Sequence, residues 1–104
     1  MTWVLLLSAA VLEAVWAIAL KRSHGLTELP ATIVFLVALA ASMALLAAAL
    51  RHLPVGTAYA VWTGAGAVCA ALAGMLLMGE PATLSRLAAI GLVATGIAWL
   101  ATAA

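Results

Sequence analysis

The chain has 104 residues, of which 69% are hydrophobic and 7% are charged, and its formal net charge is +1. Soluble domains carry about a quarter charged residues, so this composition excludes a soluble globular domain and indicates an integral membrane protein. The small net charge also excludes a strongly basic surface for binding nucleic acid.

Four apolar segments follow one another along the chain, separated by short links that contain polar residues, Gly or Pro. A helix needs about 20 apolar residues to cross a bilayer, and each segment is long enough. We therefore expect an all-α integral membrane protein with four transmembrane helices in a single domain, residues 1–104. The expected helices cover residues 2–20, 30–50, 54–78 and 84–102.

The links contain residues that commonly end or begin helices. Gly25 suits the left-handed position after the first helix. Pro30 and Pro54 suit the start of the second and third helices, where the missing N–H of proline would be unpaired anyway. Thr83 is expected to cap the N-terminus of the fourth helix.

The fourth segment is apolar except for Thr95 and carries Gly91 and Gly96. Small residues allow transmembrane helices to approach closely. Because this segment carries no residue suited to chemistry, we expect Gly91 and Gly96 to serve packing between subunits of a dimer.

The basic residues give only a weak preference for one membrane orientation. With four spans, Lys21, Arg22 and Arg86 lie on one side of the membrane and Arg51 on the other. This bias is small for the positive-inside rule to act on. Two interpretations remain: a single fixed topology, or insertion in both orientations with antiparallel pairing.

Glu13 is the only charged residue inside the first apolar segment, and it lies near the middle. A charged side chain at the bilayer centre costs about 2.5–3.5 kcal/mol on insertion scales, and ionisable residues at this depth mark functional sites by default. No Lys or Arg lies at a comparable depth to pair with it. The alternative is a structural Glu that holds helices together.

Polar and aromatic residues in the first three segments could surround Glu13. Trp16 lies one turn away on the same helix face and Ser42 lies at a similar depth in the second segment. In the third segment, four residues at positions i, i+3, i+4 and i+7 form one stripe: Tyr59, Trp62, Thr63 and Gly66. We expect Ser42 to hydrogen-bond Glu13.

A carboxylate surrounded by indole and phenol rings favours a small organic cation, because aromatic faces add about 0.5–2 kcal/mol of cation–π attraction. No His or Cys lies at the depth of Glu13, so no metal ion is expected there. No nucleophile–base pair or phosphate-binding loop is evident either. We therefore predict a protein that is not an enzyme and has no cofactor.

Two motifs resemble those of the small multidrug resistance transporters, and the resemblance covers the whole chain. Residues 54–66 read PVGTAYAVWTGAG, which is similar to the signature of the third helix in that family. Residues 13–21 read EAVWAIALK, which is most similar to the guanidinium-exporter subtype. Residues 79–81, GEP, also match.

This resemblance implies an antiparallel, dual-topology homodimer in the bacterial inner membrane that exports guanidinium ion in exchange for protons. Glu13 of both subunits would be the shared proton and substrate site. Trp16, Ser42 and Trp62 would surround it, and Tyr59 would line or gate it. The resemblance also implies residues that line the pocket or bend the third helix: Ala10, Thr63, Gly64 and Gly66.

Three residues depart from the subtype pattern. Ala10 stands where Gly is usual, Leu12 where Phe is common, and Leu26 where an aromatic residue is usual. Ala10 lies on the Glu13 side of its helix and could narrow the pocket. Three alternatives therefore stay open: an exporter of quaternary ammonium or other hydrophobic cations, a heterodimer with a similar chain, and a membrane subunit that does not transport.

Overall fold

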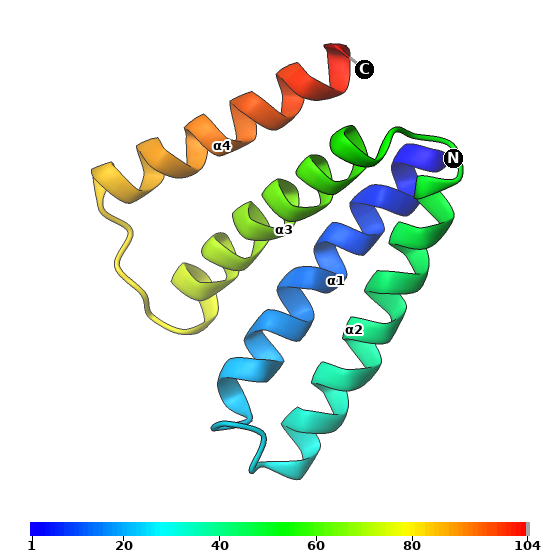
Figure 1. Cartoon of the computed structure of the whole chain (residues 1–104). Helices are drawn as coiled ribbons and strands as arrows, with labels where there is room; N and C mark the ends of the chain where they lie inside the picture. The colour runs from blue at the N-terminus through cyan, green and yellow to red at the C-terminus, as the bar shows by residue number, and fades with distance from the viewer. Residues whose placement is uncertain (104) are drawn as a thin grey trace.

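The computed structural model describes residues 1–103, which form four long α-helices (Figure 1). These are α1 (Thr2–Arg22), α2 (Leu29–Leu50), α3 (Val55–Leu77) and α4 (Leu84–Ala103). Each is long and apolar enough to cross a membrane. No strand occurs in the described part of the chain. The predicted all-α architecture with four membrane-spanning helices is confirmed.

The ends of the helices show which local signals operate. Thr83 caps α4 as predicted, because its Oγ1 accepts a hydrogen bond from the Arg86 N–H at 3.2 Å. The first helix runs two residues further than expected, to Arg22, and Ser23 is its C-cap with φ −77°. Gly25 lies in the following turn with φ +74°.

Ser23 organises the link between α1 and α2. Its side chain is fully buried, and its Oγ donates to the Leu20 carbonyl at 2.7 Å and accepts from the Leu26 N–H at 3.0 Å. The Ser23 carbonyl accepts from the backbone N–H groups of Thr27 and Glu28, both at 2.9 Å. One serine therefore satisfies backbone groups on both sides of a tight turn.

The helices are arranged in the order α2, α1, α3, α4 (Figure 1). α1 lies between α2 and α3 and packs on both, whereas α2 and α3 touch each other little. Among the four helices of residues 1–103, α4 contacts α3 alone, and none of its residues is buried. The packed unit is therefore α1, α2 and α3, with α4 attached along one side.

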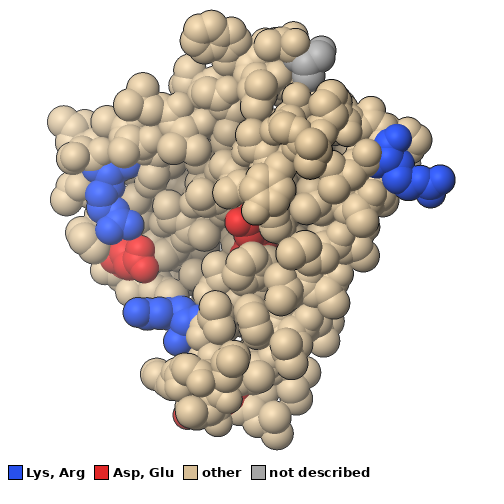
Figure 2. Space-filling model, viewed as in Figure 1, with Lys and Arg blue, Asp and Glu red and all other residues tan. Residues whose placement is uncertain are grey.

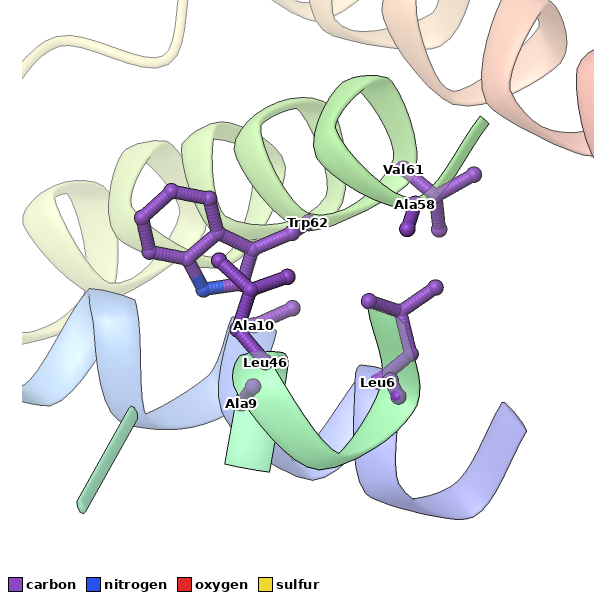
Figure 3. Packing of buried hydrophobic residues seen from close by; sticks show 8 residues of the cluster. Leu6, Ala9, Ala10, Leu46, Ala58, Val61 and Trp62 are labelled. Atoms are coloured by element: carbon purple, nitrogen blue, oxygen red, sulfur yellow. The ribbon is translucent and has the colours of Figure 1, made fainter. Parts of the chain in front are cut away.

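The core of this unit combines small residues with a few large ones. Ala9 and Ala49 are completely buried, as Ala residues are at close helix–helix contacts in membranes. Figure 3 shows Trp62 reaching from α3 over Ala10 and Leu46. The whole cluster of buried apolar residues comprises Leu6, Ala9, Ala10, Leu46, Ala49, Ala58, Val61 and Trp62.

The link between α3 and α4 is held by an ion pair. Arg86 Nη2 lies 3.1 Å from Glu80 Oε1, and the Glu80 N–H donates to the Gly74 carbonyl at 3.2 Å. Gly79, with φ +69°, makes the turn that brings Glu80 back over the last turn of α3.

In Figure 2, the Lys and Arg atoms lie toward the edges of the view, and uncharged side chains cover most of the surface.

Replacing Ser23 by Ala should lower the free energy of unfolding by about 0.5–1.5 kcal/mol, because the part-buried hydrogen bond from the Leu26 N–H loses its acceptor. The measurement is reversible unfolding in mixed micelles, followed by circular dichroism. Thr102→Ala is the matched control, since its hydroxyl bonds the Trp99 carbonyl at an exposed position. Equal effects of the two substitutions would show that the Ser23 turn does not stabilise the fold.

Candidate functional site

Glu13 lies at the middle of α1 with its side chain partly buried. Its Oε2 atom is buried and has no hydrogen-bond partner among the described residues. Leaving a buried polar atom unpaired costs about 1–3 kcal/mol, and more when the group is charged. A proton, a water molecule or a ligand with N–H donors could satisfy this oxygen, and no side chain in residues 1–103 does so here.

Gly66 of α3 packs directly against this carboxyl group. A Cβ atom added to Gly66 would overlap the Glu13 carboxyl group and would lie 2.9 Å from the Glu13 Cβ. Real Cβ atoms do not approach so closely, so only glycine allows α3 to pack against Glu13 here. α3 is one uninterrupted helix through Gly64 and Gly66 in this structure. Gly66 acts here as a close-contact residue.

Trp16 contributes the second unpaired group. Its indole N–H is buried and has no partner in residues 1–103. The ring packs edge-on against Phe35 of α2, with ring centroids 6.0 Å apart and an interplanar angle of 68°. Sequence reasoning missed Phe35. The available signal was its position seven residues before Ser42, which places both on the same face of α2.

Ser42 connects three helices. It is completely buried, and its Oγ donates to the Ala9 carbonyl of α1 at 2.8 Å and accepts from the Trp62 indole N–H of α3 at 3.1 Å. The expected hydrogen bond between Ser42 and Glu13 is not formed. A hydroxyl group has a single proton, and the Ala9 carbonyl takes it here.

The predicted stripe on α3 divides into two parts. Trp62 and Gly66 are buried toward α1, whereas Thr63 is exposed and Tyr59 is 55% exposed. Tyr59 packs edge-on against Trp62, with centroids 5.4 Å apart. Gly64 faces α4, where an added Cβ would lie 2.7 Å from Ile97. The structure therefore places Gly66 against Glu13, Tyr59 against the core residue Trp62, and Gly64 at the contact with α4.

The remaining predicted residues have different surroundings. Ala10 is 1% exposed and belongs to the core cluster around Trp62, so its methyl group fills space in the core. Gly91 and Gly96 are exposed, and a Cβ added to either would meet no atom within 4 Å. They make no close contact within residues 1–103, so their predicted role in dimer packing remains a prediction.

Glu13 is enclosed only in part, because its side chain is half-buried although its Oε2 atom is buried. Two apolar cavities of about 620 and 340 Å³ lie between the helices, and neither is lined by Glu13. Among the described residues, no group of three or more His, Cys, Asp or Glu side chains could hold a metal ion. The arrangement therefore offers a carboxyl acceptor, an indole donor and aromatic surfaces on an incompletely enclosed face.

Comparison with known proteins places this arrangement in a family. A family model described as Small Multidrug Resistance protein matches residues 1–93. A protein named Guanidinium exporter from Citrobacter freundii is 55% identical over 97 residues, covering 93% of this chain and 92% of that protein. Another of the same name, from Yersinia pestis, is 54% identical over 97 residues, covering 93% of both chains.

The family model covers α1, α2, α3 and the first half of α4, and so includes every residue around Glu13. The named relatives are exporters, and the described helices are those of a multi-pass protein of the inner membrane. The chain belongs to the small multidrug resistance family of membrane transporters.

Proposed function

We propose that the chain exports guanidinium ion in exchange for protons and that Glu13 is the site at which both bind. The observation that carries the proposal is the buried Glu13 Oε2 without a hydrogen-bond partner, in the middle of a membrane-spanning helix. The name shared by relatives at 54–55% identity supports the choice of substrate.

The chemistry of Glu13 fits guanidinium better than other cations. A guanidinium ion is planar, and its N–H groups can donate two parallel hydrogen bonds to one carboxylate. A quaternary ammonium ion has no N–H donor, so it would leave Glu13 Oε2 unpaired. The unpaired oxygen therefore favours guanidinium over the broad-specificity alternative.

Protons and guanidinium exclude each other at such a site. Both neutralise the same carboxylate, so guanidinium binds well only after the proton leaves. Coupled to a site that opens to one side of the membrane at a time, this competition produces antiport.

We further propose that the working unit is an antiparallel homodimer, in which two copies insert in opposite orientations and both Glu13 side chains face one chamber. The partial exposure of Glu13 supports this proposal, because a second copy could cover the part of the side chain that this chain leaves exposed. The exposed faces of α4, which include Gly91 and Gly96, offer a large surface for contact between copies.

The neighbouring residues have separate roles in this proposal. Trp16 donates its free N–H to a carboxylate oxygen, since an indole can only donate. Ser42 holds the Trp62 ring in place between helices, and Tyr59 supports that ring from its exposed side. The alternative of a purely structural Glu13 lacks support, because its buried oxygen bonds no other helix in the described chain.

Adding guanidinium to the protein purified in weakly buffered detergent should release protons, and Glu13→Gln should abolish the release. The measurement uses a pH-indicator dye, with guanidinium titrated from micromolar to millimolar concentrations. Glu28→Gln is the control, because Glu28 is exposed in the α1–α2 link. Proton release that persists in the Glu13 variant would contradict the proposal.

Gly66→Ala should weaken guanidinium binding while leaving the helices folded. The added methyl group displaces the Glu13 carboxyl group, and overpacking of this kind costs about 1–3 kcal/mol, which corresponds to a Kd roughly 5- to 150-fold higher. Titration calorimetry measures it. The control is Gly56→Ala on the same helix, where an added Cβ meets no atom within 4 Å. If Gly66→Ala binds guanidinium with unchanged affinity, guanidinium does not bind at the Glu13 carboxyl group beside Gly66.

Proteoliposomes should take up guanidinium under an imposed proton gradient, and tetramethylammonium should neither be taken up nor compete at equal concentration. This expectation follows from the need for N–H donors at Glu13. Radiolabelled uptake measures both cations, and liposomes with the Glu13→Gln protein provide the background. Equal transport of the two cations would favour the broad-specificity exporter.

A further inference from the structure

A groove lies between α1, α2 and α3 near the end of the molecule that carries the α1–α2 link. It is the cavity of about 620 Å³, and we call it the three-helix groove. Small side chains form its floor, including Ala14, Ala19 and Cys69. Large apolar side chains form its exposed rim, including Val15, Val34 and Leu77, which are 41%, 49% and 64% exposed.

The three-helix groove is separate from the Glu13 site. On α1 it is lined by two small residues, Ala14 and Ala19, and by a stripe of larger ones, namely Val11, Val15, Ile18 and Arg22. Each residue turns the helix by about 100°. The four residues of the stripe therefore lie within about 40° of the side of α1 that is directly opposite Glu13. A molecule in the groove therefore contacts the face of α1 that turns away from the carboxyl group.

Arg22 gives the groove a charged mouth. It ends α1, lines the cavity and is exposed. The one ion pair found in residues 1–103 joins Arg86 to Glu80, so Arg22 has no carboxylate partner there. Arg22 is thus the only charged residue that lines the groove, and it lies at the end of the apolar helix α1.

We propose that the three-helix groove binds an anionic phospholipid, with one acyl chain along its apolar floor and the phosphate at Arg22. Basic pockets between transmembrane helices are suited to anionic headgroups, and an Arg at a helix end reaches the interface with its charged group. The apolar part of the groove lies deeper in the membrane and Arg22 lies at its mouth, which matches the acyl chain and the phosphate headgroup of such a lipid.

A second copy of this chain fits the mouth less well. The sequence has three acidic residues. Glu13 lies deep in the membrane and Glu80 is paired with Arg86, which leaves Glu28 as the one acidic group a copy could offer. A bilayer with anionic lipids supplies phosphate groups at the interface throughout.

Photo-crosslinking tests the proposal on the full-length protein in lipid nanodiscs. Phosphatidylglycerol and phosphatidylcholine, each carrying the same diazirine-labelled acyl chain, are compared at equal trace amounts. Peptide mapping by mass spectrometry should find labels on the stretches 11–18 and 69–77, with phosphatidylglycerol labelling about fivefold stronger.

Three variants locate the headgroup. Arg22→Gln should reduce phosphatidylglycerol labelling of the groove to the level of phosphatidylcholine, and Arg22→Lys should retain most of the preference. Arg51→Gln should leave it unchanged, because Arg51 lies at the other end of the bundle and lines neither cavity. Excess inorganic phosphate should not compete.

A fourth variant tests the acyl-chain floor. Ala73→Leu fills the groove and should lower labelling by both lipids, whereas Ala88→Leu, on an exposed position of α4, should not. The proposal is overturned by equal labelling by the two lipids in the wild-type groove, by an effect of Arg51→Gln equal to that of Arg22→Gln, or by competition from phosphate. An unlabelled groove would show that another chain covers it.

Discussion

The hydroxyl group of Ser42 is the contact on which the arrangement of the first three helices depends. It is the only side chain in the described structure that bonds groups of both neighbouring helices, the Ala9 carbonyl of α1 and the Trp62 indole of α3. α2 and α3 touch each other little directly, so this pair of hydrogen bonds fixes their positions across α1. In an apolar interior such bonds have no competition from water, which makes the geometry well defined.

The same network explains why Glu13 stays available. Ser42 donates its proton to the Ala9 carbonyl and Trp62 donates its N–H to the Ser42 oxygen, so neither donates to Glu13, which lies one turn beyond Ala9 on α1. Gly66 brings the α3 backbone against Glu13 but offers no donor, since its N–H belongs to the helix. The packing therefore holds the carboxyl group in a defined place while leaving one oxygen unpaired. If Glu13 had a purely structural role, its carboxyl oxygens would be expected to form hydrogen bonds to the neighbouring helices.

The sequence was sufficient to predict four helices, because each apolar segment matches the thickness of a bilayer and each link carries Gly, Pro or a capping residue. It also singled out Glu13, whose position conflicts with its surroundings. Other features depend on how helices cross. The partner of the Ser42 hydroxyl, the packing of Phe35 on Trp16 and the contact of Gly64 with α4 follow from interhelical angles that periodicity leaves open. Gly64 and Gly66 look equivalent in sequence, yet they face different helices.

The attachment of α4 to α3 alone has a consequence for how the protein is made. A chain synthesised from its N-terminus can complete the α1–α3 unit, including every residue of its buried cluster, before α4 leaves the ribosome. The Glu80–Arg86 pair then joins the last helix to a finished unit. The fold therefore permits biogenesis in two stages, in which α1, α2 and α3 pack around Glu13 first and the surface of α4 is added afterwards.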